Sequence, residues 1–404
     1  MNKTKFFCLV VLFALLATNS CKYSKKPEYL INIEYKGKLT AGQIQYYASY
    51  TGLSYDMQML INKDIEMFRV EYNTIFQGRH IIASGIMIVP KNYLSTVPML
   101  IYNHGTIKKN NTPSLSSSKS VTLDVILVSI TSSIFGNVGI VPDFIGYGAS
   151  ATIEHPYIHG ESLGQTIFDM VNAVIEYFEI NQNTTISYKV VSVGYSEGGY
   201  ATIAFQKTVQ QAQTDIRVIK NYAGAGPYDN IAFIKELMLK NENLDLQHLS
   251  SYLWVLSMYK QYMGYSKAYG DIFSASDNNI FAAGNYDFGY SKTYPDINKN
   301  PQLLFNSQFI KAVNSESDTE FLQILYKNSL VDFVPKDSLI LFHSQADTYV
   351  YVVNTDNAYA SMQSHNAPVR KEIVPLAARE DHIVAAFTFL QNTVTNMLLT
   401  EVFR

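Results

Sequence analysis

Short apolar runs and amphipathic segments alternate along most of the chain. Residues 68–72 switch between apolar and polar positions, and residues 80–89 are β-branched and apolar until Pro90 ends the run. With Gly78 between them, these two segments predict a β-hairpin. Apolar runs typical of buried parallel strands follow at residues 99–102, 139–141 and 190–193, and further strands are predicted at residues 217–222, 339–342 and 370–374.

Helices are predicted between these strands. Apolar residues recur at steps of three and four from Leu163 to Phe178, which places them on one face of a helix over about residues 161–179. Further helices are expected at about residues 198–209 and 383–399. Because strands alternate with helices, we predict an α/β fold with a mostly parallel, doubly wound sheet flanked by helices.

The regular alternation lapses between about residues 228 and 335. This segment contains Trp254, the only tryptophan of the chain, and many tyrosines. We interpret it as a helical cap insertion that covers the carboxyl ends of the strands and gives a substrate an apolar wall. Residues 67–227 and 336–404 would then form the α/β core. Alternatively, the aromatic side chains only form the insertion's own core.

Composition and charge indicate a globular chain without an affinity for polyanions. Of the 404 residues, 47% are hydrophobic and 16% are charged, which is enough apolar material for a sizeable core. The formal net charge is −3, and Lys and Arg do not cluster beyond the N-terminal region. Nucleic acid is therefore not an expected partner.

The N-terminus has the pattern of a targeting segment. Lys3 and Lys5 precede an uninterrupted apolar run at residues 6–17, which is short for a bilayer span but suits a secretory signal. We predict that residues 1–20 are a signal peptide and that the chain is exported.

Cys21 follows the small residues at positions 17–20, and this segment resembles the lipobox of bacterial lipoproteins. The resemblance implies lipidation of Cys21 and a membrane anchor in a bacterial cell envelope, followed by a tether and N-terminal segment over residues 21–66. The alternative is an ordinary signal peptide with an incidental cysteine. Because Cys8 lies in the predicted signal, the mature chain would have no thiol left for a disulfide, a nucleophile or a metal.

The strongest chemical signal is the segment Gly194-Tyr195-Ser196-Glu197-Gly198-Gly199, which follows a predicted strand and precedes a predicted helix. A serine on so tight a turn adopts strained backbone angles, so its neighbours must be nearly free of side chains. Gly194 and Gly198 meet that demand, and Gly199 allows the helix to approach the strand. We predict that Ser196 is a nucleophile on this elbow.

A serine hydroxyl needs a base to take its proton and an acid to orient that base. On this type of sheet the acid and the histidine follow the serine in that order. Asp347 lies just beyond the predicted strand at residues 339–342, and His382 lies between the last strand and the closing helix. We therefore predict a triad of Ser196, Asp347 and His382.

Other acids and histidines fit this geometry less well. Asp381 is adjacent to His382 in the chain and would struggle to reach its ring. Asp332 and Asp337 precede a strand and would lie at its wrong end, and His365 precedes the last strand.

An oxyanion formed at Ser196 requires preorganised donors. The backbone N–H of Glu197 is one predicted donor, and the N–H of Gly105 or Thr106 is the second, because that loop follows the strand at residues 99–102. The ring of His104 is interpreted as a structural bracket.

Four segments together resemble the secretory lipase and esterase family of α/β-hydrolases, which includes bacterial lipoproteins. These segments are Asn103–Thr106, Pro142–Gly148, His155–Tyr157 and Gly194–Gly199. The resemblance spans about residues 72–382. It implies the α/β-hydrolase fold, hydrolysis of carboxylic esters on a lipid or a polysaccharide without a metal or cofactor, and the same triad. Within these segments, Asp143 and His155 are interpreted as organisers of loops, and the side chain of Glu197 either as a bracket behind the site or as a charge at the N-terminus of the helix.

Two other functions stay open at this point. An aminopeptidase or oligopeptidase of the same fold would use the same triad on amides. An inactive lipid-anchored binding protein could keep the fold without the chemistry, although the complete set of Ser196, Asp347 and His382 argues against it.

Overall fold

The computed structural model describes residues 27–91, 96–108, 115–118, 121–181, 185–277, 297–400 and 402–403. These residues form a nine-stranded sheet in the order β1-β2-β3-β5-β4-β6-β7-β8-β9. The strands are β1 (Leu30–Leu39), β2 (Ile65–Phe76), β3 (Arg79–Pro90), β4 (Thr96–Asn103), β5 (Val138–Pro142), β6 (Thr185–Tyr195), β7 (Arg217–Gly224), β8 (Ser338–Ser344) and β9 (Val369–Val374).

The sheet is antiparallel at one edge and parallel over the rest. β1, β2, β3 and β5 pair antiparallel, whereas β5, β4, β6, β7, β8 and β9 pair parallel. The predicted hairpin is confirmed, because β2 and β3 pair from Ile65 with Pro90 to Phe76 with Arg79. β1 was not predicted: most of its residues are exposed or half-buried, so its apolar pattern is weak.

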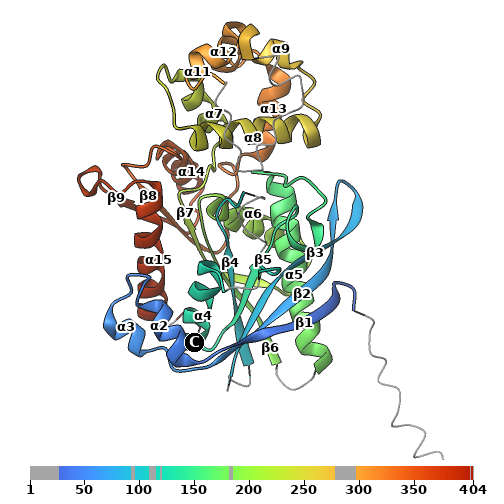
Figure 1. Ribbon diagram of the computed structural model, residues 1–404, viewed down its shortest axis with the longest axis vertical. Coiled ribbons are helices and arrows are strands. Elements are labelled where there is room, and N and C mark those ends of the chain that lie inside the picture. Colours follow the sequence, from blue (N-terminus) through green and yellow to red (C-terminus); the bar gives the residue numbers. More distant parts are fainter. Residues whose placement is uncertain are drawn as a thin grey trace, which may run out of the picture.

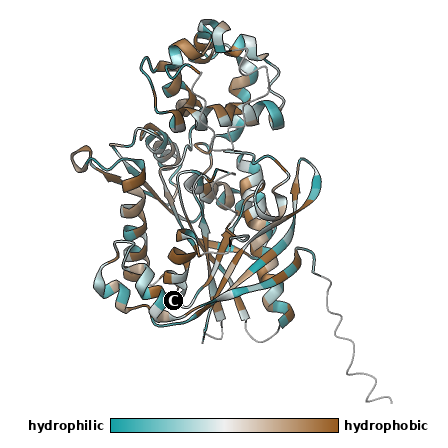
Figure 2. Cartoon of the chain, in the orientation of Figure 1, coloured by the Kyte–Doolittle hydropathy of each residue, from teal (hydrophilic) through white to brown (hydrophobic). Residues whose placement is uncertain are grey.

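Helices cover both faces of the sheet (Figure 1). Figure 2 shows hydrophobic residues gathered on the central strands and on the helices packed against them. The helices around the sheet are α2 (Ala41–Ala48), α3 (Tyr55–Met59), α4 (Leu123–Phe135), α5 (Gly160–Asn181), α6 (Glu197–Gln211), α14 (Val353–Ser364) and α15 (His382–Leu399).

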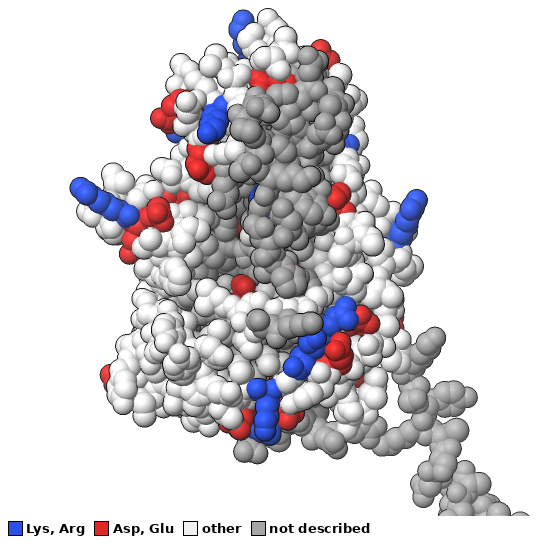
Figure 3. Space-filling model, viewed as in Figure 1, with Lys and Arg blue, Asp and Glu red and all other residues white. Residues whose placement is uncertain are grey.

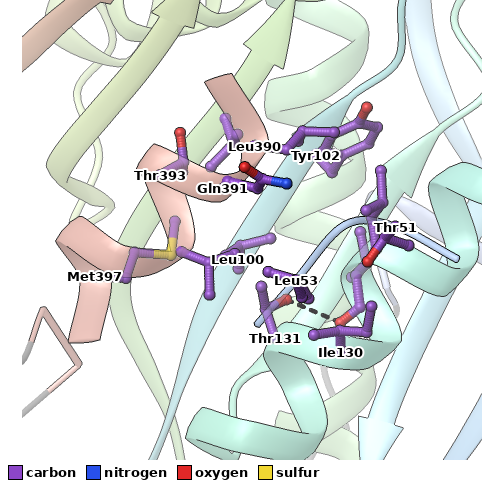
Figure 4. Close-up of a pocket in the computed structure, with 14 residues that line it drawn as sticks. Thr51, Leu53, Leu100, Tyr102, Ile130, Thr131, Leu390, Gln391, Thr393 and Met397 are labelled. Carbon is purple, nitrogen blue, oxygen red and sulfur yellow. Dashed lines mark hydrogen bonds between the residues drawn. The ribbon is translucent and has the colours of Figure 1, made fainter. Parts of the chain in front are cut away.

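The strands divide their side chains between two hydrophobic clusters. In β4, Met99 and Ile101 belong to the cluster under α5, α6 and α14, while Leu100 and Tyr102 belong to the cluster under α4 and α15. Successive side chains of a strand point to opposite faces, so a continuous apolar run is what a strand covered on both sides requires. A small, mostly apolar pocket remains between α4, α15 and β4 (Figure 4).

Residues 228–335 contain helices that stand above the carboxyl ends of the parallel strands (Figure 1). They are α7 (Asn230–Leu239), α8 (Leu246–Met263), α9 (Tyr269–Ile272), α11 (Pro301–Leu304), α12 (Ser307–Asn314) and α13 (Thr319–Asn328). The cap residues Trp254, Phe273 and Phe309 share one hydrophobic cluster with Ile101 of the sheet. The aromatic side chains of this insertion therefore form its own core and also join it to the sheet.

The predicted signal peptide and Cys21 lie outside the described residues. Among the residues that are described, no helix combines the length and the hydropathy needed to cross a bilayer. On the face shown in Figure 3, Lys and Arg side chains are dispersed among Asp and Glu side chains.

Candidate active site

Ser196 occupies a sharp turn between β6 and α6. Its backbone angles are φ 59° and ψ −125°, a region that residues with a side chain rarely adopt. A Cβ atom on Gly194 would stand 2.1 Å from the carbonyl oxygen of Gly198, and one on Gly198 would stand 2.0 Å from that of Asn103. The glycines of the motif therefore let β4, β6 and α6 come close enough to form this turn.

The structure brings the three predicted residues of the triad together. His382 is the first residue of α15, and its Nε2 lies 2.9 Å from the hydroxyl oxygen of Ser196. Its Nδ1 lies 2.6 Å from Oδ2 of Asp347, which follows β8. Because the carboxylate faces Nδ1, the proton of the neutral ring belongs there, and Nε2 can accept from the serine.

Asp347 is held as a carboxylate by the hydrogen bonds around it. Its Oδ1 accepts from the backbone N–H groups of Tyr349, at 2.8 Å, and Val350, at 2.9 Å. Burial by itself raises the pKa of Asp347, but hydrogen bonds and charge from His343 and His382 outweigh it and lower the pKa below its usual value. The group can therefore orient and stabilise a cationic imidazolium.

Two tyrosine rings enclose the imidazole of His382. The ring of Tyr349 stacks on it at a centroid distance of 5.1 Å and an angle of 25°, and the ring of Tyr195 lies at 5.1 Å and 47°. Burial raises the pKa of Tyr349 to about 12, so its hydroxyl stays neutral. The imidazole of His382 is consequently fixed by packing as well as by hydrogen bonds.

Two of the predicted oxyanion donors, Gly105 and Thr106, line a pocket beside Ser196, and the third, Glu197, directly follows Ser196 in the chain. As the first residue of α6, Glu197 has a backbone N–H with no partner inside the helix. Gly105 and Thr106 line a pocket with an empty volume of about 1100 Å³ together with Ser196 and His382. The arrangement can therefore place main-chain donors beside a reacting carbonyl.

The side chain of Glu197 is buried in a pair with His155. Its Oε1 lies 2.6 Å from Nε2 of His155, whose Nδ1 lies 2.6 Å from the carbonyl oxygen of Ile145. That carbonyl can only accept, so Nδ1 must donate, and the contact between Nε2 and Oε1 must hold a further proton. The pair is thus neutral overall, and it links the elbow to the loop after β5.

Asp143 and His104 have structural contacts, as the sequence suggested. Asp143 accepts from the hydroxyl groups of Ser84, at 2.6 Å, and of Ser116. The ring nitrogens of His104 lie 2.7 Å from the carbonyl oxygen of Gly105 and 3.3 Å from that of Asp143. Both side chains hold the loops that surround the pocket.

The rival acids and histidine are engaged elsewhere. The side chain of Asp381 caps α15 by accepting from two backbone N–H groups. Asp337 precedes β8 at the opposite end of the sheet, Asp332 lies beside Tyr326, and His365 follows the exposed end of α14. None of these four hydrogen-bonds to Ser196 among the described residues.

Several residues around the site carried no signal in the sequence. The hydroxyl of Ser344 donates to the carbonyl oxygen of Glu380 at 2.5 Å. This hydrogen bond joins the end of β8, just before Asp347, to the segment just before His382. Asp124 lines the pocket from α4, and burial raises the pKa of its carboxyl. Tyr349 and His248 make further contacts across the site. None of them belongs to a motif, and only their position in space reveals them.

Within the described part of the chain, no group of three or more His, Cys, Asp or Glu side chains is arranged to hold a metal ion.

The sequence matches no protein-family model and no curated protein sequence. Solved structures are similar to it over nearly its full length. A Legionella pneumophila protein provisionally described as a hydrolase is 22% identical, with a TM-score of 0.78 over 93% of this chain and 98% of its own. A mutant of LipA, a rice cell wall degrading esterase from Xanthomonas oryzae, is 18% identical, with a TM-score of 0.73 over 93% of this chain and 100% of its own.

Lipase A from Candida antarctica is more distant. It is 16% identical, with a TM-score of 0.62 over 89% of this chain and 79% of its own. At these identities the similarity concerns the path of the backbone. Together with the mostly parallel sheet and the helices on both its faces, it shows that the chain has the α/β-hydrolase fold.

Proposed function

We propose that the protein is a serine hydrolase that cleaves carboxylic esters through an acyl-enzyme on Ser196. The observation that carries the proposal is the hydrogen-bonded series from Ser196 to His382 to Asp347, on a strained turn and beside an open pocket. That geometry is what activation of a serine hydroxyl requires.

The reaction would proceed in two halves. His382 takes the proton of the Ser196 hydroxyl as the serine oxygen attacks the ester carbonyl. The backbone N–H groups of Glu197 and of Gly105 or Thr106 stabilise the oxyanion. His382 then gives the proton to the leaving alcohol. A water molecule, deprotonated by the same histidine, releases the acid and restores Ser196. Asp347 keeps the imidazole in the required tautomer throughout.

Ester hydrolysis is favoured over the alternatives by the structural relatives, whose names include an esterase that degrades rice cell walls and a lipase. A peptidase would use the same three side chains. An inactive binding protein would not need them to lie within hydrogen-bonding distance of one another. Whether the ester belongs to a lipid or to a polysaccharide is a separate question, which a substrate panel addresses.

The first test compares wild-type protein with Ser196→Ala on p-nitrophenyl esters from acetyl to long-chain, on feruloyl and acetyl-xylan substrates, and on a chromogenic peptide. We expect ester turnover by the wild type and a loss of kcat of more than about 10⁴-fold in the variant. A fluorophosphonate should label the wild type alone. Faster turnover of the peptide than of every ester would favour a peptidase, and an unlabelled wild type would favour a binding protein.

We also propose that Cys21 is acylated after removal of residues 1–20 and anchors the protein in a bacterial cell envelope. The proposal rests on the apolar segment and the small residues before Cys21. Metabolic labelling with an alkyne analogue of palmitate should mark the wild type and not Cys21→Ser. Equal labelling of both proteins, or a wild type found only in the soluble fraction, would contradict the anchor.

A further inference from the structure

The ring of Tyr349 lies in a stack that joins the candidate active site to the cap. One face of the stack is the imidazole of His382, at 5.1 Å and 25°. The other is the imidazole of His248, which projects from α8 and lies at a centroid distance of 4.4 Å and an angle of 14°. Tyr349 also lines the pocket that contains Ser196.

Hydrogen bonds fix Tyr349 to α8 at both ends of the residue. Its carbonyl oxygen lies 2.8 Å from Nε2 of His248 and accepts from the hydroxyl of Tyr252 at 3.3 Å. Its own hydroxyl is hydrogen-bonded to that of Ser251. Because α8 supplies all of these partners, the location of the Tyr349 ring is set by the cap.

The same residue also holds the acid of the triad. The backbone N–H of Tyr349 donates to Oδ1 of Asp347 at 2.8 Å, while Oδ2 faces His382. A shift of the Tyr349 segment would therefore move the carboxylate and remove one face of the imidazole's enclosure at once.

The stack has a chemical consequence for the base. When His382 takes the proton of Ser196, it becomes a cation, and the electron-rich face of a tyrosine attracts a cation placed over it. The charged groups that act on the ring of Tyr349 are Asp347 and Glu197 on the core side and Asp245 on the cap side, and the ring of His248 lies against it.

We propose that Tyr349 is a positioning residue through which the cap helix α8 holds Asp347 and His382 in reactive geometry. This inference rests on the proposed function of Ser196. It gives the insertion a task at the candidate triad: without α8 in place, Asp347 and His382 lose the contacts that Tyr349 makes with both of them.

The test compares three variants of the full chain. Tyr349→Leu removes the ring, Tyr349→Phe keeps the ring but loses the contact with Ser251, and His248→Ala removes the outer face of the stack. Tyr351→Leu is the matched control, because Tyr351 belongs to the same segment and its ring also lies near His248, at a centroid distance of 6.5 Å, but under Lys240, at 4.5 Å, instead of against His382. Circular dichroism verifies that each variant is folded.

We expect Tyr349→Leu to lower kcat by about 10- to 100-fold, with KM changed by less than about 3-fold, because misalignment of the base affects the chemical step more than substrate binding. Tyr349→Phe should recover most of that loss. His248→Ala should show a smaller fall in kcat of the same kind. Tyr351→Leu should retain the wild-type kcat and KM.

Three results would overturn the inference. The first is an unchanged kcat in Tyr349→Leu or, if that variant does not fold, in His248→Ala. The second is a rise in KM of Tyr349→Leu without a fall in kcat, which would make Tyr349 a substrate contact. The third is an equal fall in kcat in Tyr349→Leu and Tyr351→Leu. Failure of the proposed function looks different, because a wild type that neither turns over esters nor reacts with a fluorophosphonate would remove both proposals together.

Discussion

At the scale of single residues, the candidate site combines a strained serine with partners that are held from several sides. Ser196 has a positive φ of 59°, and the carbonyl oxygen of Gly224 accepts from its backbone N–H at 2.8 Å. Such strain persists only where neighbouring contacts enforce it. Close packing at Gly194 and Gly198 enforces it here. The backbone conformation that presents the Ser196 hydroxyl therefore lowers the stability of the folded protein.

This strain predicts that the Ser196→Gly variant is more stable than the Ser196→Ala variant. Alanine keeps the steric conflict of a Cβ at positive φ, whereas glycine removes it at some entropic cost in the unfolded chain. We expect a difference of about 1 kcal/mol in the free energy of unfolding, measured by denaturant titration. Both variants lack the Ser196 hydroxyl and should be inactive, so they differ only in the Cβ atom at this position. Equal stabilities would mean that the turn is relaxed in solution.

At the scale of elements, the residue before α5 is a histidine whose ring must stay neutral. His159 precedes α5, and its Nδ1 accepts from the backbone N–H of Ser162 at 3.3 Å. Burial lowers the pKa of His159 to about 4, with Glu161 opposing and Lys327 reinforcing the shift. A protonated ring could not accept this hydrogen bond, and it would place a positive charge at the positive end of the helix.

The sign of the resulting pH dependence follows from that shift. An unfolded histidine takes up its proton near pH 6.5, but folded His159 does so only near pH 4, so the unfolded state binds more protons between these values. His159 should therefore cost about 3 kcal/mol of stability as the pH falls from about 7 to below 4. This loss of stability is complete below the pKa of His159 in the folded protein and absent above its pKa in the unfolded chain.

Denaturant titrations of the wild type and His159→Gln at pH 7.5 and pH 4.5 test this prediction. The variant should lose less stability between the two values than the wild type does, whatever its stability at pH 7.5. His365→Gln, at an exposed position after α14, is the control and should keep the wild-type dependence. A His159→Gln protein with the wild-type dependence would show that the ring titrates as in the unfolded chain.

At the scale of the whole molecule, cap and core share one hydrophobic cluster. Trp254 of α8 is fully buried, and its ring stacks on that of Tyr157 at a centroid distance of 4.4 Å and an angle of 12°. It also meets the ring of His155 edge-on at 5.5 Å, and His155 is bonded to Glu197. The insertion is therefore packed against the segment after β5, which the pair of His155 and Glu197 links to the elbow.

This continuity predicts a single cooperative unfolding transition. Trp254 is the only tryptophan, so its fluorescence reports on the junction between cap and core, while far-ultraviolet circular dichroism reports on all the helices and strands. The two probes should give the same midpoint in denaturant. Loss of fluorescence at a lower denaturant concentration than loss of ellipticity would indicate that the cap detaches first.

Much of the core and of the candidate site could be predicted from local pattern. Apolar runs predicted the strand before Ser196 and the two strands beside it in the sheet, and the glycines at positions 194 and 198 predicted the elbow, because a strained turn admits few other residues. The order of acid and histidine along the chain, together with their positions relative to the predicted strands, selected Asp347 and His382, which the structure places within hydrogen-bonding distance of their partners. These features depend on residues that are close in sequence or on connection rules of the sheet.

What the sequence by itself determined is thus the class of fold, the hairpin and the residues that can carry the chemistry, because periodicity and steric demand are written into neighbouring positions. Only the tertiary structure decided that β1 joins the sheet, that His155 pairs with Glu197, and that the rings of His248 and Tyr349 stack next to His382. Those contacts join segments separated by tens of residues to about a hundred. Their energy comes from burial, hydrogen bonds and ring packing between distant segments, which no local pattern encodes.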